Sequence, residues 1–303
     1  MRGAGLALLL LLGVLLLPPV SRRAEAEGLA PDLMLGHVGA TRARYDDTLL
    51  DIARRFDLGF VELRAANPQV DVWLPGAGRD IVLPLARFLP DAPRQGIVIN
   101  LPEMRLYWFP GKGRAIESFP IGIGREGRQT PLGGTAVMRK TKAPSWYPPA
   151  WRRAESPELP AVVPPGPDNP LGDFAMYLGW DAYLIHGTNI PWAVGRRLSA
   201  GCIRMYPEDV EHLFAEVPVG TRVTVVDQQV KTGWIDGQLY VQIYPSQQQA
   251  DEIEADGRFH PETPPDLDTR IRQAAGPAID RIDWEVVQQA VMDRSGMPVQ
   301  ITR

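Results

Sequence analysis

The chain has 303 residues, among them a single cysteine, four histidines, 29 glycines and 30 prolines. The high share of glycine and proline disfavours a helical bundle and predicts many turns between short strands. Lys and Arg total 32 against 36 Asp and Glu, a net charge of −4, which argues against a nucleic-acid partner. The single cysteine excludes an internal disulfide framework and a zinc site built from several thiolates.

Residues 1–26 have the features of a secretory signal peptide. Arg2 gives a positive start, residues 6–17 form an apolar run, and a small-x-small cleavage site ends at Ala26. The apolar run is shorter than the roughly 20 residues that a membrane-spanning helix needs. Without this segment 29 basic and 35 acidic residues remain, a net charge of −6. We therefore expect an exported protein, with an uncleaved N-terminal anchor as the alternative.

Residues 37–84 predict a small module with the order strand, helix, helix, strand. Apolar residues at helical spacing indicate a first helix capped by Asp47 or Thr48 and a second helix that ends before Pro68. A strand at residues 79–84 closes this layout. The alternative is a helical cap on the following domain.

This module resembles LysM, a family that binds the N-acetylglucosamine-containing glycan of peptidoglycan or chitin. The resemblance is carried by residues 45–49, Ile52, Ala53, Phe56, Leu63, Asn67 and residues 81–84. Asp46 stands where the family usually has glycine. The resemblance implies weak glycan binding, since a single module lacks the affinity that tandem copies gain through effective concentration.

A strand-rich domain follows over residues 94–226. Its regular spacing of short β-rich runs predicts a mainly-β sandwich or barrel. One helix is expected at Pro207–Val217, where proline suits the first turn and the apolar residues form a stripe. The expected strands lie at residues 97–101, 105–109, 116–123, 134–140, 174–178, 183–186 and 222–226.

Two further segments have a distinct composition. Residues 144–170 hold nine of the 30 prolines together with Trp146, Tyr147 and Trp151. This segment is either a stiff surface connection or a lid whose aromatic faces contact substrate. Residues 227–303 form a C-terminal extension whose last part is acidic and helix-prone, and the sequence assigns it no role.

The candidate chemistry lies between residues 183 and 205. A buried strand ends at His186, and Cys202 follows sixteen residues later. A cysteine nucleophile reacts as a thiolate, a state that an adjacent imidazole can supply at neutral pH. Gly201 leaves room for substrate and frees its own N–H for an oxyanion hole. Arg204 offers a fixed charge that can stabilise the thiolate or bind a substrate carboxylate, although it can also pair with Asp209.

The segment resembles the active-site signature of the L,D-transpeptidases, the YkuD-like catalytic domain. The signature is carried by His186-Gly187-Thr188-Asn189, Pro191, Gly195 and Ser199-Ala200-Gly201-Cys202-Ile203-Arg204-Met205, and residues 130–133 and 164–172 support it. Many members have a second histidine directly before the Gly-Cys pair, where this chain has Ala200.

The resemblance implies a two-step acyl transfer on peptidoglycan by an enzyme of the periplasm or cell wall. Cys202 attacks the third residue of a tetrapeptide stem, His186 is the base, and the Gly187 carbonyl orients the imidazole. Gly201, Cys202 and Arg204 are candidates for the oxyanion hole and substrate contacts, together with Ser199, Thr188 and Trp146. The acceptor is a second stem, giving a 3→3 cross-link, or the lysine of an outer-membrane lipoprotein. No metal or organic cofactor is expected.

Three alternatives remain. A sortase-like transpeptidase also uses exported His, Cys and Arg, but its Thr-Leu-x-Thr-Cys strand is absent. A hydrolase would use water in place of the amine and act as an L,D-carboxypeptidase. A non-catalytic peptidoglycan-binding protein would rely on the LysM-like module, and Cys202 would then be unreactive.

Overall fold

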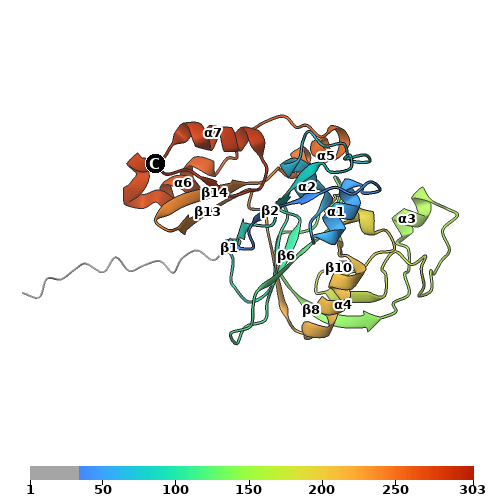
Figure 1. Ribbon diagram of the computed structural model, residues 1–303. Helices are drawn as coiled ribbons and strands as arrows, with labels where there is room; N and C mark the ends of the chain where they lie inside the picture. The colour runs from blue at the N-terminus through green and yellow to red at the C-terminus, as the bar shows by residue number, and fades with distance from the viewer. Residues whose placement is uncertain (1–33) are drawn as a thin grey trace, which may run out of the picture. The chain divides into compact units, whose positions relative to one another are not determined.

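The computed structural model describes residues 34–303, and the predicted signal peptide lies outside these described residues. The central feature is one eight-stranded mixed sheet, in the order β11-β10-β9-β8-β12-β5-β6-β7 (Figure 1). The mainly-β prediction is therefore confirmed. The strands are β5 (Gly96–Asn100), β6 (Arg105–Phe109), β7 (Glu117–Pro120), β8 (Gly133–Lys142), β9 (Phe174–Leu178), β10 (Leu184–His186), β11 (Ile203–Arg204) and β12 (Arg222–Val226).

The two edge strands of this sheet meet. Just after β7, Gly122 forms an antiparallel bridge with Arg204 of β11. The Gly122 N–H donates to the Arg204 carbonyl at 2.8 Å, and the Arg204 N–H donates to the Gly122 carbonyl at 2.9 Å. The bridge pairs backbone groups that an open edge would leave to water. The sheet thus curls until its first and last strands are joined.

Helix α4 (Pro207–Glu216) packs against β9 of this sheet. Pro207 occupies the first turn, where its missing N–H has no intrahelical partner to lose. Val210 and Leu213 are buried in the same core as Ile185 and Ile203. The helix therefore covers the strands that carry the predicted site.

The N-terminal segment has the predicted order of strand, helix, helix, strand. Strand β2 (Val38–Arg42) pairs antiparallel with β3 (Asp80–Pro84), and α1 (Leu49–Arg55) and α2 (Phe60–Ala66) lie between them in the sequence. Thr48 caps α1 through a capping box with Asp51. A short strand pair, β1 (Met34–Leu35) with β4 (Arg87–Phe88), flanks this segment.

Helix α2 is hydrogen-bonded to the loop that joins His186 to Cys202. The Phe60 N–H donates to the Val194 carbonyl at 3.4 Å, and the Val61 N–H donates to the Gly195 carbonyl at 3.1 Å. These are first-turn N–H groups, which have no acceptor within their own helix. The loop thus supplies the carbonyls that complete the start of α2.

A buried ion pair network reinforces this contact. Glu62 of α2 accepts from Arg87 at 3.0 Å and from Arg105 of β6 at 2.9 Å. Both guanidinium groups are almost fully buried, so each depends on its carboxylate partner. The module is joined to the sheet by charge as well as by apolar packing.

The C-terminal extension forms a second small sheet, which the sequence analysis did not predict. Its order is β13-β14-β15, and helices α6 and α7 contact the β13–β14 hairpin (Figure 1). Ile271 and Ala275 are buried in α6, in the part of the extension predicted to be helix-prone. The elements are β13 (Val230–Ile235), β14 (Gln238–Ile243), α5 (Gln247–Asp256), α6 (Leu267–Ala275), α7 (Trp284–Asp293) and β15 (Val299–Gln300).

This extension is tied to the central sheet through Lys231. Its ammonium lies 2.5 Å from a Glu103 carboxylate oxygen and also donates to the Phe88 carbonyl. Tyr107 donates to the same carboxylate at 2.7 Å. Burial lowers the pKa of Lys231 to about 8, although the Glu103 charge opposes this fall. Within residues 34–303 no helix is long and apolar enough to span a bilayer.

The contact between α2 and the loop predicts a specific sensitivity at Gly195. Its φ is +74°, and an added Cβ would lie 2.1 Å from the Phe60 nitrogen. We expect Gly195→Ala to lower the free energy of unfolding by about 2 kcal/mol or more, because backbone strain and a backbone clash combine. Denaturant unfolding measures this loss.

Gly76→Ala is the matched control for this substitution. Gly76 also has a positive φ, +92°, but an added Cβ there meets no atom within 4 Å. Gly76→Ala should therefore lower the free energy of unfolding by the backbone strain alone, about 1 kcal/mol. Equal losses for the two variants would contradict the predicted role of the α2–loop contact.

Candidate active site

The geometry of the site follows from the pairing of β10 with β11. The two strands are parallel, with Ile185 opposite Ile203 and His186 opposite Arg204. Opposed residues in a sheet project to the same face, and alternate residues along a strand do so too. His186 and Arg204 therefore share one face, and Cys202 directly precedes β11. Both isoleucines are fully buried, so the other face belongs to the core.

The His186 ring has a fixed orientation. Its Nδ1 lies 2.6 Å from the Gly187 carbonyl oxygen. A carbonyl oxygen only accepts, so Nδ1 carries the proton and the lone pair of the neutral ring lies on Nε2. This is the contact that the family resemblance implies for Gly187.

The ring is uncharged at neutral pH. Burial lowers the pKa of His186 to about 3, and the positive charge of Arg204 acts in the same direction. Hydrogen bonds to the Gly187 and Leu171 carbonyls partly oppose the fall in pKa. A neutral imidazole with a free lone pair has the protonation state that a general base requires.

Cys202 is a thiol in this resting structure. Its Sγ donates a hydrogen bond to the Ala182 carbonyl at 3.5 Å. Burial raises the pKa of the thiol, while the Leu184 N–H and the charge of Arg204 act to lower it. Among the described residues no hydrogen bond joins Cys202 to His186. Burial disfavours both charged forms and so favours the neutral thiol and the neutral imidazole; that the imidazole activates Cys202 as a thiolate stays a prediction.

Ser199 shapes the loop before the thiol. Its Oγ accepts from the Gly201 N–H at 3.0 Å and donates to the Cys202 carbonyl at 2.6 Å. The expectation of a free Gly201 N–H is corrected, because that donor is already used. No hydrogen bond found in residues 34–303 uses the Cys202 N–H, which leaves it as the available donor. Ser199 is buried and both of its hydrogen bonds lie within the loop, and its expected substrate contact stays a prediction.

Gly201 is required by packing as well as by backbone conformation. Its φ is +106°, and an added Cβ would lie 2.5 Å from the Tyr183 ring. The space that the glycine leaves is filled by Tyr183, which corrects the expectation that substrate enters there. The Gly201 carbonyl accepts from the Thr130 hydroxyl at 2.8 Å, so this turn is bonded on both sides.

Two other predicted residues form hydrogen bonds within their own loops. The Thr188 hydroxyl accepts from the Ile190 N–H at 3.0 Å and is buried, so it shapes the turn after His186, and its expected substrate contact stays a prediction. Trp146 exchanges two backbone hydrogen bonds with Val163, at 2.9 and 2.8 Å. These bonds join the two ends of the proline-rich segment, and no hydrogen bond in the described part of the chain joins Trp146 to Cys202 or His186.

Arg204 has no carboxylate partner among the described residues. The alternative of an ion pair with Asp209 is therefore not realised in this structure. The Arg204 Nε is buried and makes no hydrogen bond, and burial lowers the pKa of the guanidinium. A partly buried guanidinium without a carboxylate partner, two residues from a thiol, is suited to interact with a negative charge that arrives with substrate.

Backbone groups complete the site, and sequence reasoning missed them. They are the Ala182 carbonyl, the Leu184 N–H and the Leu171 carbonyl. No side-chain pattern marks such groups. The one unusual signal, a φ of +65° at Ala182, belongs to the structure and cannot be seen in the sequence.

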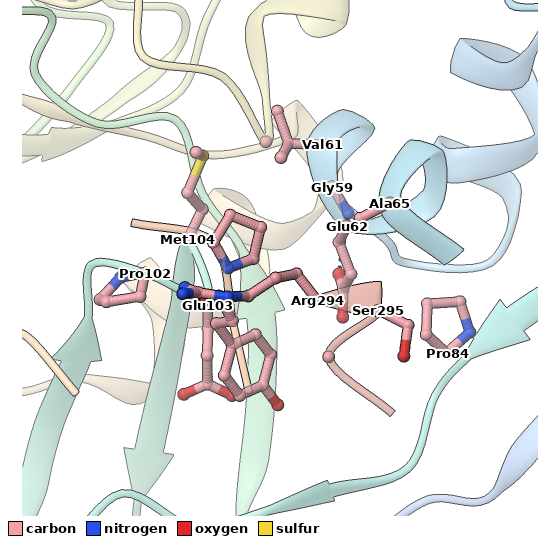
Figure 2. A pocket seen from close by; sticks show the side chains of 14 residues that line it. Gly59, Val61, Glu62, Ala65, Pro84, Pro102, Glu103, Met104, Arg294 and Ser295 are labelled. Atoms are coloured by element: carbon pink, nitrogen blue, oxygen red, sulfur yellow. Dashed lines mark hydrogen bonds between the residues drawn. The ribbon is translucent and has the colours of Figure 1, made fainter. Parts of the chain in front are cut away.

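A pocket of the protein does not include the two reactive side chains (Figure 2). It lies between α2, the turn at Pro102 and the C-terminal residues Arg294 and Ser295, and its lining includes neither His186 nor Cys202. Within residues 34–303 no group of three or more His, Cys, Asp or Glu side chains is placed to hold a metal ion.

Comparisons with known proteins identify related chains. The YkuD family, an L,D-transpeptidase catalytic domain, matches residues 94–225. The chain is 42% identical over 261 residues to a Salmonella typhimurium protein named "Probable L,D-transpeptidase ErfK/SrfK", which covers 84% of this chain and 82% of that protein. It is 40% identical over 256 residues to "Probable L,D-transpeptidase YbiS" of Escherichia coli, over 82% of this chain and 81% of that one.

The resting charge state predicts how the Cys202 thiol reacts with an alkylating reagent. The rate of alkylation by iodoacetamide should rise with pH and follow a single titration. Its midpoint should lie above the ordinary cysteine pKa of about 8.5, because burial disfavours the thiolate. Stopped samples analysed by intact mass give the rate at each pH. The denatured chain is the control and should titrate near the ordinary value. A plateau of high reactivity below pH 7 would instead reveal a thiolate–imidazolium pair.

Proposed function

Because the chain belongs to the L,D-transpeptidase family, we propose that it transfers an acyl group from peptidoglycan stem peptides through a thioester on Cys202. The observation that supports this proposal is the β10–β11 register, which puts His186 opposite Arg204, in the strand that Cys202 directly precedes. A thiol, an oriented neutral imidazole and an unpaired cation are the groups that acyl transfer by a cysteine needs.

The first step forms the acyl-enzyme. The Cys202 sulfur attacks the carbonyl of the third stem residue, a diamino acid, as His186 Nε2 takes the thiol proton. The negative charge that develops on the carbonyl oxygen is stabilised by the Cys202 N–H. The carbon–nitrogen bond to the terminal D-Ala then breaks, and the His186 imidazolium protonates the leaving amine. A thioester remains on the enzyme.

The protonation states fit this sequence of proton transfers. His186 begins neutral, because burial lowers its pKa, and it is charged only between attack and departure of the amine. During that interval the Arg204 charge favours the anionic intermediate and destabilises the imidazolium, which promotes the return of the proton to the leaving group.

The second step restores the thiol. An amine attacks the thioester, His186 takes its proton, and the Cys202 sulfur leaves and is reprotonated. The amine of a second stem gives a 3→3 cross-link, which we propose as the general outcome. The C-terminal lysine of an outer-membrane lipoprotein is the narrower acceptor hypothesis. Water in place of the amine would make the enzyme an L,D-carboxypeptidase.

The N-terminal module is proposed to contact the glycan of the same substrate. Its order of elements is that expected for a LysM-like module. Its helix α2 is bonded to the loop between His186 and Cys202, so a glycan on the module would lie on a part of the protein fixed to the catalytic loop. This substrate places the enzyme outside the cytoplasm, in agreement with the predicted export signal.

Turnover of a disaccharide-tetrapeptide tests the proposal. His186→Gln should lower the rate of D-Ala release at least about a hundredfold, because general base catalysis is lost. Cys202→Ala should abolish release. Liquid chromatography with mass detection measures D-Ala.

His212→Gln is the matched control, since this half-exposed histidine lies on the outer side of α4 and pairs with Glu117. Its rate should equal that of the wild type. Full activity of His186→Gln would show that the base lies elsewhere, and a wild type that releases no D-Ala would favour the non-catalytic binding protein.

The product identifies the acceptor. Incubation with donor stem and an excess of a second stem should yield a cross-linked dimer with the loss of one D-Ala. Parallel reactions contain a peptide with a C-terminal lysine, or no amine. Formation of the tripeptide alone in every reaction would assign hydrolysis and contradict the transferase proposal.

A further inference from the structure

Three arginines gather around one carboxylate beside the catalytic loop. Guanidinium nitrogens of Arg125, Arg128 and Arg152 lie 3.8, 3.9 and 3.5 Å from the oxygens of Glu155. We call these three residues the arginine cluster. Among the described residues, Glu155 is the only acidic side chain paired with them, so two positive charges are left uncompensated.

Glu155 forms no hydrogen bond with the guanidinium groups of the arginine cluster. All three separations exceed the length of a normal N–H···O hydrogen bond, about 2.7 to 3.2 Å. Each guanidinium carries five N–H donors that match a carboxylate in a two-point contact. The side chains of the cluster are a third to a half exposed, so a carboxylate from solution can reach them.

The cluster is joined to the loop that carries the nucleophile. The Arg125 N–H donates to the Ser199 carbonyl at 3.0 Å, and Gly124 forms a bridge with Ser199. The Thr130 hydroxyl donates to the Gly201 carbonyl. Residues 124–130 therefore lie directly against the turn that precedes Cys202.

Arg152 belongs to the cluster from a second segment of the chain. Its positive charge is a minor cause, after burial, of the lowered pKa of the Arg204 guanidinium. Arg152 and Glu155 belong to α3 (Ala150–Glu155), within the proline-rich segment. Trp151 of the same helix stacks under Arg128, whose guanidinium carbon lies 3.4 Å from the ring centroid. This cation–π contact fixes α3 against residues 124–130.

We propose that the arginine cluster, through Arg152, binds a free carboxylate of the stem peptide outside the attacked bond. This inference rests on the proposed function and adds to it a substrate class: a stem that retains its side carboxylates, in preference to one in which they are amidated. Arg204 and the cluster would then contact two different negative charges of one peptide, which fixes the direction in which it lies across Cys202.

Binding measurements on the full chain with Cys202→Ala test the inference without requiring turnover. Calorimetry compares a disaccharide-tetrapeptide that has free side carboxylates with the same compound amidated at those groups. Amidation should weaken binding about tenfold. Adding Arg152→Gln to this variant should weaken binding of the free-carboxylate stem about tenfold. Binding of the amidated stem should be unchanged, because that stem has no side carboxylate for Arg152 to pair with.

Arg153→Gln is the matched control. Arg153 is the neighbour of Arg152 on α3 and pairs with no carboxylate among the described residues, and its substitution should leave both affinities unchanged. Equal affinity for the two stems would overturn the inference, as would an Arg152→Gln loss of the same size on both. If binding depends on the carboxylate while the wild type releases no D-Ala, the inference holds and the proposed function fails.

Discussion

The site depends on the two-residue strand β11 being paired along both edges. On one side it pairs in parallel with β10, and on the other its Arg204 bridges to Gly122. A strand of two residues has too few hydrogen bonds to fix its own register, so its two neighbours must do so. A slip of one residue would turn Arg204 to the sheet face opposite His186. The closure of the sheet is thus what aligns the reactive groups.

The segments outside the central sheet also act on the catalytic loop. Helix α2 binds the carbonyls of Val194 and Gly195, while Arg197 donates to the Gln247 carbonyl at 2.7 Å at the start of α5. The loop between base and nucleophile is therefore bonded to both the N-terminal module and the C-terminal extension. Because long loops cost conformational entropy to order, these contacts allow the fifteen residues between His186 and Cys202 to present a defined geometry. The flanking segments have a structural role at the site that is independent of any ligand they bind.

The sequence predicts most of the central architecture but little of the hydrogen bonding at the site. Expected strands such as 105–109, 174–178 and 222–226 appear with these same bounds, because turns rich in glycine and proline separate clear β-rich runs. The hairpin of β13 and β14 was missed although Asp236-Gly237 is a strong turn signal.

At the site itself, His186 and Cys202 are identified by residue type and spacing. Two other features depend on tertiary packing and cannot be predicted from the amino-acid sequence. One is the hydrogen bond from the Gly201 N–H to Ser199, and the other is the burial that favours the neutral forms of both reactive groups.

The most direct test of this account is the location of the acyl group on the enzyme. The protein is mixed with a disaccharide-tetrapeptide in the absence of an amine acceptor, quenched in acid within one turnover, digested and mapped by mass spectrometry. The account predicts that the peptide containing Cys202 gains the mass of the stem without its terminal D-Ala, and that this adduct is lost on treatment with hydroxylamine. Release of D-Ala with no adduct on Cys202, or with an adduct on another residue, would contradict it.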